Sequence, residues 1–186
     1  MELKIHHITG IGLMSAIICI LGPIVIPIGM VPVSFTGIGI YLSLFLIGKK
    51  RTVTAVFIYL CIGLVGLPVF SGFTSGPGKL LGPTGGYLVG YVLSAYVCGG
   101  LMERRKKKNK EGSEKRQNWE NFVFLLVGNL ILYIIGSLWL SKSSSLGFET
   151  AVQIGVLPFI VPDILKIIFT ITLGRELKKR MGNVEM

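Results

Sequence analysis

Two charged side chains stand alone in a long apolar segment near the C-terminus. Asp163 and Lys166 lie inside the stretch from Val156 to Phe169, whose other residues are uncharged. At a spacing of three residues on a helix, both side chains point from the same face. Each charge costs about 2.5 to 3.5 kcal/mol at the centre of a bilayer, so an intramembrane pair predicts a functional site. The alternative is a structural pair that neutralises itself or fixes this helix to a neighbour.

Two prolines precede and interrupt the same segment. Pro158 and Pro162 each remove a backbone hydrogen bond from a continuous helix, and Pro162 also fits the first turn of a new helix. We therefore expect two helical pieces, with Asp163 and Lys166 in the first turns of the second. Transport proteins place ligand sites at such broken helices. A kink that serves only packing is the alternative.

A second stretch, from Gly66 to Tyr87, combines seven glycines and three prolines in 22 residues. This composition excludes a regular helix through its middle. Glycines let backbone N–H groups approach a ligand closely, while Phe70, Phe73 and Tyr87 supply apolar walls. The stretch predicts part of a small-molecule pocket, with an ordinary loop as the alternative.

The elements that must position these residues are membrane helices. The chain of 186 residues is 51% hydrophobic and 15% charged, with a mean hydropathy of +0.71. Soluble domains carry roughly 25% charged residues, so an integral membrane protein is indicated and a water-soluble globule is not. Uncharged runs occupy 5–48, 52–78, 80–102 and 121–141. Because a spanning helix needs about 20 apolar residues, we expect an all-α membrane protein, a single domain over 1–186, with six spans near 6–26, 34–48, 52–69, 85–102, 120–141 and 151–174.

The basic residues predict the orientation of these spans. With the N-terminus inside, 16 of the 19 Lys and Arg residues fall in cytoplasmic segments. The largest group occupies a basic cytoplasmic linker at 103–118. Its residues are interpreted as a signal for topology, with attraction to anionic membrane lipid as the alternative. An outer loop at 70–84 carries Lys79. We therefore expect both termini in the cytoplasm and a multi-pass protein of a prokaryotic plasma membrane. The net charge of +10 does not indicate nucleic-acid binding, because the basic residues are clustered between apolar runs.

Sequence motifs for common enzyme chemistry are missing. The chain has no P-loop, no H-E-x-x-H and no G-x-S-x-G, so neither an ATPase nor a protease or hydrolase is indicated. Three isolated cysteines and one His-His pair predict no metal site, and nothing implies a cofactor. If the chain transports a solute, the energy comes from an ion gradient or another subunit.

Several motifs resemble one known family. Leu67-Pro-Val-Phe70, Gly82-Pro-Thr-Gly-Gly-Tyr-Leu-x-Gly90 and Pro158-x-x-x-x-Asp163-x-x-Lys166 look like BioY, the biotin-specific membrane subunit of energy-coupling factor (ECF) transporters. Tyr133-x-x-Gly136-x-x-Trp139 is also similar. The resemblance covers nearly the whole chain and agrees with six spans.

The resemblance implies a division of labour. This subunit would capture biotin from outside, and a transmembrane coupling subunit with two ATP-binding cassette ATPases would release it inward. The contact with the coupling subunit is usually an Ala-x-x-x-Ala-like face, matched here by Gly12 and Ala16.

The same resemblance suggests roles around biotin. Asp163 would accept from the ureido N–H groups, and Lys166 would neutralise Asp163 or donate to the ligand. Backbone N–H groups of Thr84, Gly85 and Gly86 would meet the carboxylate at a helix N-terminus, with Lys79 as a further contact. Phe73 and Tyr87 would cover the bicycle.

The chain departs from the family pattern at two places. Ser34-Phe35-Thr36-Gly37 stands where Thr-Leu-Gln-Thr is usual, and Pro162 stands where Gly is common. Three alternatives remain open. They are a subunit of the same kind for another vitamin, a small proton-coupled carrier that uses Asp163, and a purely structural membrane subunit.

Overall fold

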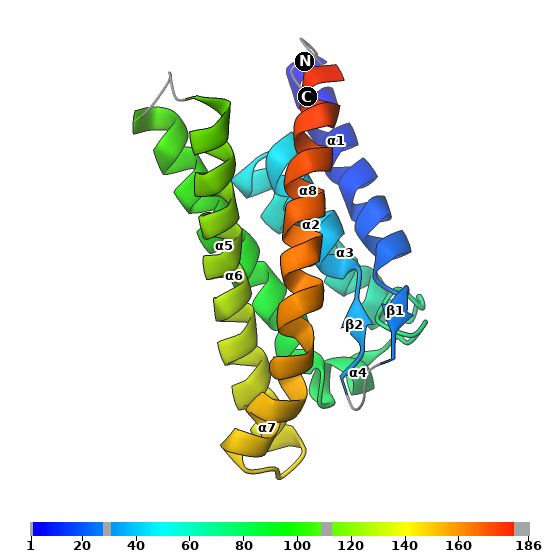
Figure 1. Cartoon of the computed structure of the whole chain (residues 1–186). Coiled ribbons are helices and arrows are strands. Elements are labelled where there is room, and N and C mark those ends of the chain that lie inside the picture. Colours follow the sequence, from blue (N-terminus) through cyan, green and yellow to red (C-terminus); the bar gives the residue numbers. More distant parts are fainter. Residues whose placement is uncertain (1, 28–30, 109–112, 181–186) are drawn as a thin grey trace.

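The computed structural model describes residues 2–27, 31–108 and 113–180, and most of them are helical. The six longer helices are roughly antiparallel to their chain neighbours (Figure 1). The elements in chain order are α1 (Glu2–Leu21), β1 (Val25–Ile26), β2 (Val33–Ser34), α2 (Thr36–Leu46), α3 (Lys49–Val65), α4 (Pro77–Leu81), α5 (Gly85–Lys108), α6 (Glu114–Ser143), α7 (Phe148–Gly155), the short 3₁₀ helix η1 (Leu157–Phe159) and α8 (Ile160–Arg180).

Glycine and proline set the ends of several helices. Helix α1 ends directly before Gly22-Pro23, because a proline disfavours helical backbone at the residue that precedes it. Gly66 ends α3 in the left-handed region, with φ of 115°, where a side chain would be strained. Gly48 has φ of 78° and makes the tight turn between α2 and α3. The chain reversals therefore occur where the sequence supplies the required backbone freedom.

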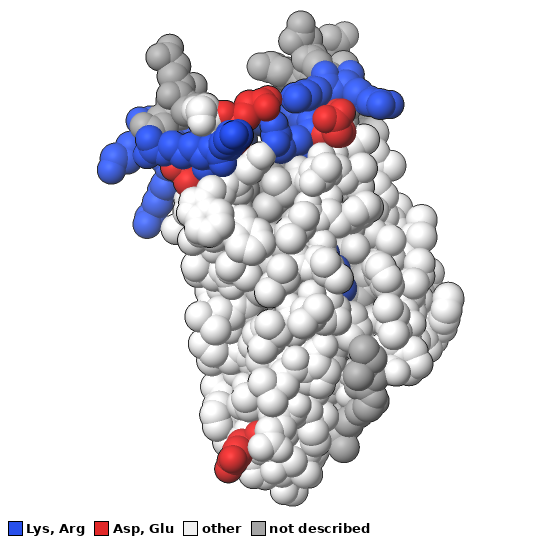
Figure 2. Space-filling model, in the orientation of Figure 1, with Lys and Arg blue, Asp and Glu red and all other residues white. Residues whose placement is uncertain are grey.

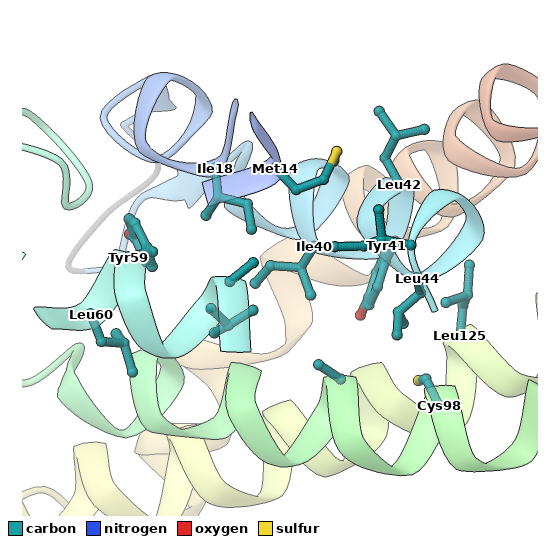
Figure 3. Close-up of a cluster of buried hydrophobic side chains, with 14 of the residues drawn as sticks. Met14, Ile18, Ile40, Tyr41, Leu42, Leu44, Tyr59, Leu60, Cys98 and Leu125 are labelled. Carbon is teal, nitrogen blue, oxygen red and sulfur yellow. The ribbon is translucent and has the colours of Figure 1, made fainter. Parts of the chain in front are cut away.

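Helix α2 lies at the centre of the molecule. It packs against α1, α3, α5 and α8, and nine of its eleven residues are buried. Its core side chains meet those of α1, α3 and α5 in one cluster (Figure 3), where Ile40 and Tyr41 lie among residues such as Met14, Ile18 and Tyr59. Because α2 is enclosed by other helices, it can be short and still be held in place.

The segment 148–180 is broken, as the two prolines predict. Helix α7 ends at Gly155, η1 contains Pro158, and α8 begins at Ile160. Asp163 and Lys166 lie in the first two turns of α8, as predicted. Pro162 is the third residue of α8 rather than the first, so the break falls slightly earlier than a start at Pro162 implies.

Other predicted boundaries shift in ways that the local sequence explains. The predicted span 6–26 overruns α1, because 25–26 pairs with 33–34 as an antiparallel hairpin. The predicted span 52–69 overruns α3, which ends before Gly66. Much of the basic segment 103–118 is helical, since α5 continues to Lys108 and α6 begins at Glu114. Charged residues can extend a membrane helix into water, so the apolar run underestimates the length of α5 and α6.

The surface of the molecule has a charged end and apolar sides. Most of the basic side chains gather at the end where both termini lie, whereas the flanks are almost uncharged (Figures 1 and 2). Large apolar side chains are exposed on all the longer helices except the enclosed α2, for example Ile8, Phe57, Tyr96, Leu130 and Phe169. Three segments are long and apolar enough to cross a membrane: Gly85–Lys108, Glu114–Ser143 and Phe148–Arg180. Shorter apolar helices cover Ile5–Leu21 and Thr36–Leu46.

Candidate ligand-binding site

A cavity lies between the β2–α2 corner, the start of α5, the middle of α6 and the start of α8. It contains about 540 Å³ of space between atoms, including the part that opens to solvent. Most of its wall is apolar or aromatic, with a few polar groups. The lining residues are Val31, Pro32, Ser34, Thr36, Ser71, Thr84, Tyr87, Leu88, Tyr91, Leu132, Tyr133, Phe159, Asp163 and Lys166.

Asp163 is the centre of a polar network in this cavity. Its Oδ1 accepts a hydrogen bond from Lys166 Nζ at 2.8 Å, and its Oδ2 accepts one from Tyr133 Oη at 2.6 Å. The Nδ2 of Asn129 donates to the same Oδ2 at 3.2 Å. The side chains of Asp163 and Lys166 are only 13% and 11% exposed. These three donors offset the cost of burying the carboxylate.

Lys166 connects the network to the β2–α2 corner. Its Nζ also donates to the backbone carbonyl of Ser34 at 2.8 Å. Ser34 is fixed in turn, because its Oγ lies 2.6 Å from Thr36 Oγ1 and donates to the carbonyl of Gly22 at 3.1 Å. Thus the segment Ser34–Gly37, which departs from the family pattern, contributes Ser34 and Thr36 to the cavity wall. Its Ser34 carbonyl also accepts a hydrogen bond from Lys166.

Two members of the network were not predicted as site residues. Asn129 and Tyr133 lie one helical turn apart on α6, and Asn129 Nδ2 donates to Tyr133 Oη at 3.2 Å. On the other side, Tyr41 Oη of the central helix α2 donates to Asn129 Oδ1 at 3.3 Å. A sequence signal exists, since Asn129 and Tyr133 are two polar residues at a spacing of four in an uncharged segment. This sequence signal identifies the two residues as part of the site only once the structure shows that α6 lies beside α8.

Tyr87 enters the cavity through contacts that only glycines allow. A Cβ at Gly136 would overlap the Tyr87 ring, and a Cβ at Gly155 would overlap its hydroxyl. Tyr87 Oη donates to the Gly155 carbonyl at 2.8 Å, so the ring is held between α6 and α7. Thr84 lies beside it and is 8% exposed. Its buried Oγ1 has no hydrogen-bond partner among the described residues, which leaves it available to a ligand in the cavity.

Four of the predicted contact residues do not line this cavity. Phe73 is 70% exposed and has φ of 57°, so the structure places its ring away from the site. Lys79 is on the short helix α4, where partial burial lowers the pKa of its ammonium group. The other two are glycines, considered next.

Gly85 and Gly86 serve packing at the start of α5. The Gly85 N–H donates to the carbonyl of Gly82 at 3.0 Å. A Cβ at Gly85 would overlap the Leu80 carbonyl, and a Cβ at Gly86 would overlap Trp139 of α6. Trp139 Nε1 donates to the Gly82 carbonyl at 2.9 Å, which anchors this turn to α6. The glycines allow the approach that brings Thr84 and Tyr87 to the cavity.

Gly12 and Ala16 lie far from these contacts, on an exposed face of α1. Both residues are exposed, and no heavy atom lies within 4 Å of a Cβ built at Gly12. The predicted contact surface for a coupling subunit is therefore accessible in this structure.

Comparison with known proteins identifies the family of the chain. The family model described as "BioY family" matches residues 1–183. The chain belongs to the BioY family. The resemblance noted from the motifs is thus confirmed over nearly the full length.

BioY relatives cover almost all of the chain. A protein of Lactococcus lactis subsp. cremoris named "Biotin transporter BioY2" is 33% identical over 97% of this chain and 94% of its own length. A "Probable biotin transporter BioY" of Pyrococcus horikoshii is 31% identical over 95% of this chain and 98% of its own. Among solved structures, "Crystal structure at 2.1 A of the S-component for biotin from an ECF-type ABC transporter" matches with a TM-score of 0.86. That match has 29% identity and covers 96% of this chain and 93% of the solved one.

Proposed function

We propose that this chain is the biotin-binding S component of an ECF-type transporter, and that the cavity around Asp163 receives biotin. The observation that carries the proposal is the Asp163 network, which lies in a mostly apolar cavity of a BioY-family fold. A structural subunit needs no such cavity beside its ion pair. The names of the relatives favour biotin over another vitamin and over a proton-coupled carrier.

The cavity chemistry suits the parts of biotin. The ureido ring offers two N–H donors and a carbonyl, and the carboxylate of Asp163 is the matching acceptor for the donors. The sulfur-containing ring is apolar and fits against Tyr87, Tyr91 and Phe159, which line the cavity. Thr84 Oγ1 and the ammonium group of Lys166 are donors for a carbonyl or carboxylate oxygen. Lys79 could meet the carboxylate only if α4 shifted toward the cavity.

The proposed setting is a plasma membrane crossed six times by a single domain. The apolar flanks in Figure 2 support this setting, and the short α2 fits it as an enclosed span. By the positive-inside rule, the basic end with both termini faces the cytoplasm. The cavity then lies toward the opposite, external side, where a subunit that captures biotin needs it.

The proposed partners are a transmembrane coupling subunit and two ATP-binding cassette ATPases. The sequence of this chain contains no P-loop, so ATP hydrolysis must come from another chain. The exposed α1 face with Gly12 and Ala16 is the proposed contact, because small residues let helices approach closely.

The test is calorimetric titration of biotin into the purified chain and its Asp163→Asn variant. Asparagine keeps the shape of the side chain but loses the charge that biotin N–H groups and Lys166 require. We expect one-to-one binding that the variant weakens by about tenfold or more, where each tenfold step is about 1.4 kcal/mol.

The three other outcomes are distinguishable. Binding that Asp163→Asn leaves unchanged would keep the ligand and refute the site. No binding of biotin but binding of a different vitamin would refute the ligand. Uptake by the chain alone that collapses with the proton gradient would favour the carrier alternative.

A further inference from the structure

A basic hollow lies at the opposite end of the molecule from the biotin cavity. Helices α2, α5, α6 and α8 meet there around a space of about 590 Å³, again including its open part. A second hollow of about 690 Å³ adjoins it and shares Phe45, Lys106 and Lys178. The basic residues that line the two are Lys49, Lys50, Arg51, Arg105, Lys106, Arg175 and Lys178, and the acidic ones are Glu103 and Glu114.

The two arginines of the first hollow are already engaged. Arg105 Nη1 donates to Asn121 Oδ1 at 2.7 Å and to the carbonyl of Gln117 at 3.0 Å. Arg175 forms an ion pair with Glu114 at 2.7 Å. These contacts hold α5 and α8 against the start of α6 and so fix the shape of the hollow.

The two lysines that both hollows share are not neutralised in this way. Within 2–27, 31–108 and 113–180, no carboxylate lies within ion-pair distance of Lys106 or Lys178. Their positive charges repel each other and Arg105 adds to the repulsion of Lys106, which the negative charge of Glu103 offsets only in part. A fold that holds like charges together at one mouth is stabilised by an anion between them.

A further polar atom points to an occupant. Asn118 lines the first hollow, and its Oδ1 is buried without a hydrogen-bond partner among the described residues. The amide can be rotated by half a turn, which would present its NH₂ group to an anion instead.

The surroundings of the hollow indicate which anion. Leu44, Phe45 and Met102 line the same space as the basic residues. The hollow therefore lies at the border between the charged end and the apolar flank that Figure 2 shows. An occupant with a phosphate group and acyl chains matches both parts of this border, because basic pockets between membrane helices on the cytoplasmic side bind anionic headgroups.

We propose that the hollow between α2, α5, α6 and α8 binds the phosphate of an anionic phospholipid from the cytoplasmic leaflet, with Lys106 and Lys178 as its principal cationic contacts. The proposal rests on the membrane orientation given above and is independent of biotin. Such a lipid would bridge α5 and α8, which carry the basic ends of two different parts of the bundle.

The experiment is native mass spectrometry of the full chain in detergent, titrated with phosphatidylglycerol or phosphatidylcholine of the same acyl chains. The test variant is Lys106→Gln/Lys178→Gln. The control Lys107→Gln/Lys115→Gln removes the same charge from the same end, at exposed positions that line neither hollow. Calorimetry with biotin checks that each variant is folded.

We expect the wild type and the control to bind phosphatidylglycerol in preference to phosphatidylcholine, and the test variant to bind it about tenfold more weakly or worse. Equal loss in both variants, or no preference between the lipids, would overturn the site. A competition with inorganic phosphate separates the two sources of the anion. Displacement of the lipid by phosphate at an equal concentration would overturn the lipid assignment, whereas lipid binding that persists in excess phosphate supports it.

Discussion

Asp163 accepts hydrogen bonds from Lys166, Tyr133 and Asn129. A carboxylate oxygen can accept more than one hydrogen bond, so these donors fix the orientation of Asp163 and leave it able to receive further ones. If Asp163 binds biotin as proposed, this fixed orientation would lower the cost of ordering the acceptor on binding.

Tyr133→Phe tests whether the hydrogen bond from Tyr133 to Asp163 contributes to the binding of biotin. The variant removes the 2.6 Å hydrogen bond to Oδ2 and keeps the ring that lines the cavity. A lost hydrogen bond to a charged group is worth about 1.5 to 3 kcal/mol, so we expect the affinity for biotin to fall by about tenfold or more.

Calorimetry measures that change, with Tyr96→Phe as the matched control. Tyr96 is on α5 and 55% exposed, and it does not line the cavity. If Tyr133→Phe binds biotin as tightly as Tyr96→Phe does, the hydrogen bond from the Tyr133 hydroxyl to Asp163 does not contribute to the affinity.

At the scale of the element, α6 presents a functional stripe toward the cavity. Asn129, Tyr133 and Gly136 recur at a spacing of four and three residues, so they share one face of the helix. Asn129 and Tyr133 both donate to Asp163, and Asn129 also donates to Tyr133. Gly136 leaves the space that the Tyr87 ring occupies. One helix thus aligns groups that belong to α5 and α8.

Gly136→Ala tests the close approach of α5 and α6. Alanine is normally about 1 kcal/mol more favourable than glycine inside a helix. Here its Cβ would overlap the rigid Tyr87 ring, so we expect a lower melting temperature and weaker binding of biotin.

Thermal unfolding and calorimetry check both expectations, and Gly12→Ala is the control. Gly12 is also inside a helix, but a Cβ there meets no heavy atom within 4 Å. An increase in melting temperature for Gly136→Ala, as for the control, would show that Tyr87 is free to move aside.

At the scale of the whole molecule, the three surfaces with proposed roles lie apart from one another. The cavity lies toward one end, the basic hollow lies at the other, and the exposed face of α1 runs along one side (Figures 1 and 2). A change on one of these surfaces can therefore leave the others intact.

Gly12→Leu tests the side surface. Leucine favours the helix and has open space, so we expect normal folding and normal biotin binding. The added bulk would keep the coupling subunit from approaching α1, so we expect co-purification of the coupling module to be lost.

Pull-down of the assembled transporter from membranes measures this loss, with Thr172→Leu as the control. Thr172 is exposed on α8, and its hydroxyl donates only within its own helix, to the Ile168 carbonyl. Retention of the complex by Gly12→Leu would place the coupling contact elsewhere on the molecule.

The sequence by itself determined the class of fold and the central pair of the site. Apolar runs separated by basic clusters indicate membrane helices, and charges within such runs are too costly to be accidental, so Asp163 and Lys166 could be identified by their type and position. The break before Asp163 was also predictable, because Pro158 and Pro162 act on the local backbone.

Only the tertiary structure decided which other residues join that pair. Asn129 and Tyr133 lie 34 and 30 residues before Asp163, and no local rule says that α6 turns this face toward α8. For the same reason the sequence did not show that Phe73, which was expected at the site, is 70% exposed and does not line the cavity. The breaks in a helix depend on neighbouring residues, whereas the residues that line a cavity depend on how helices distant in the sequence pack together.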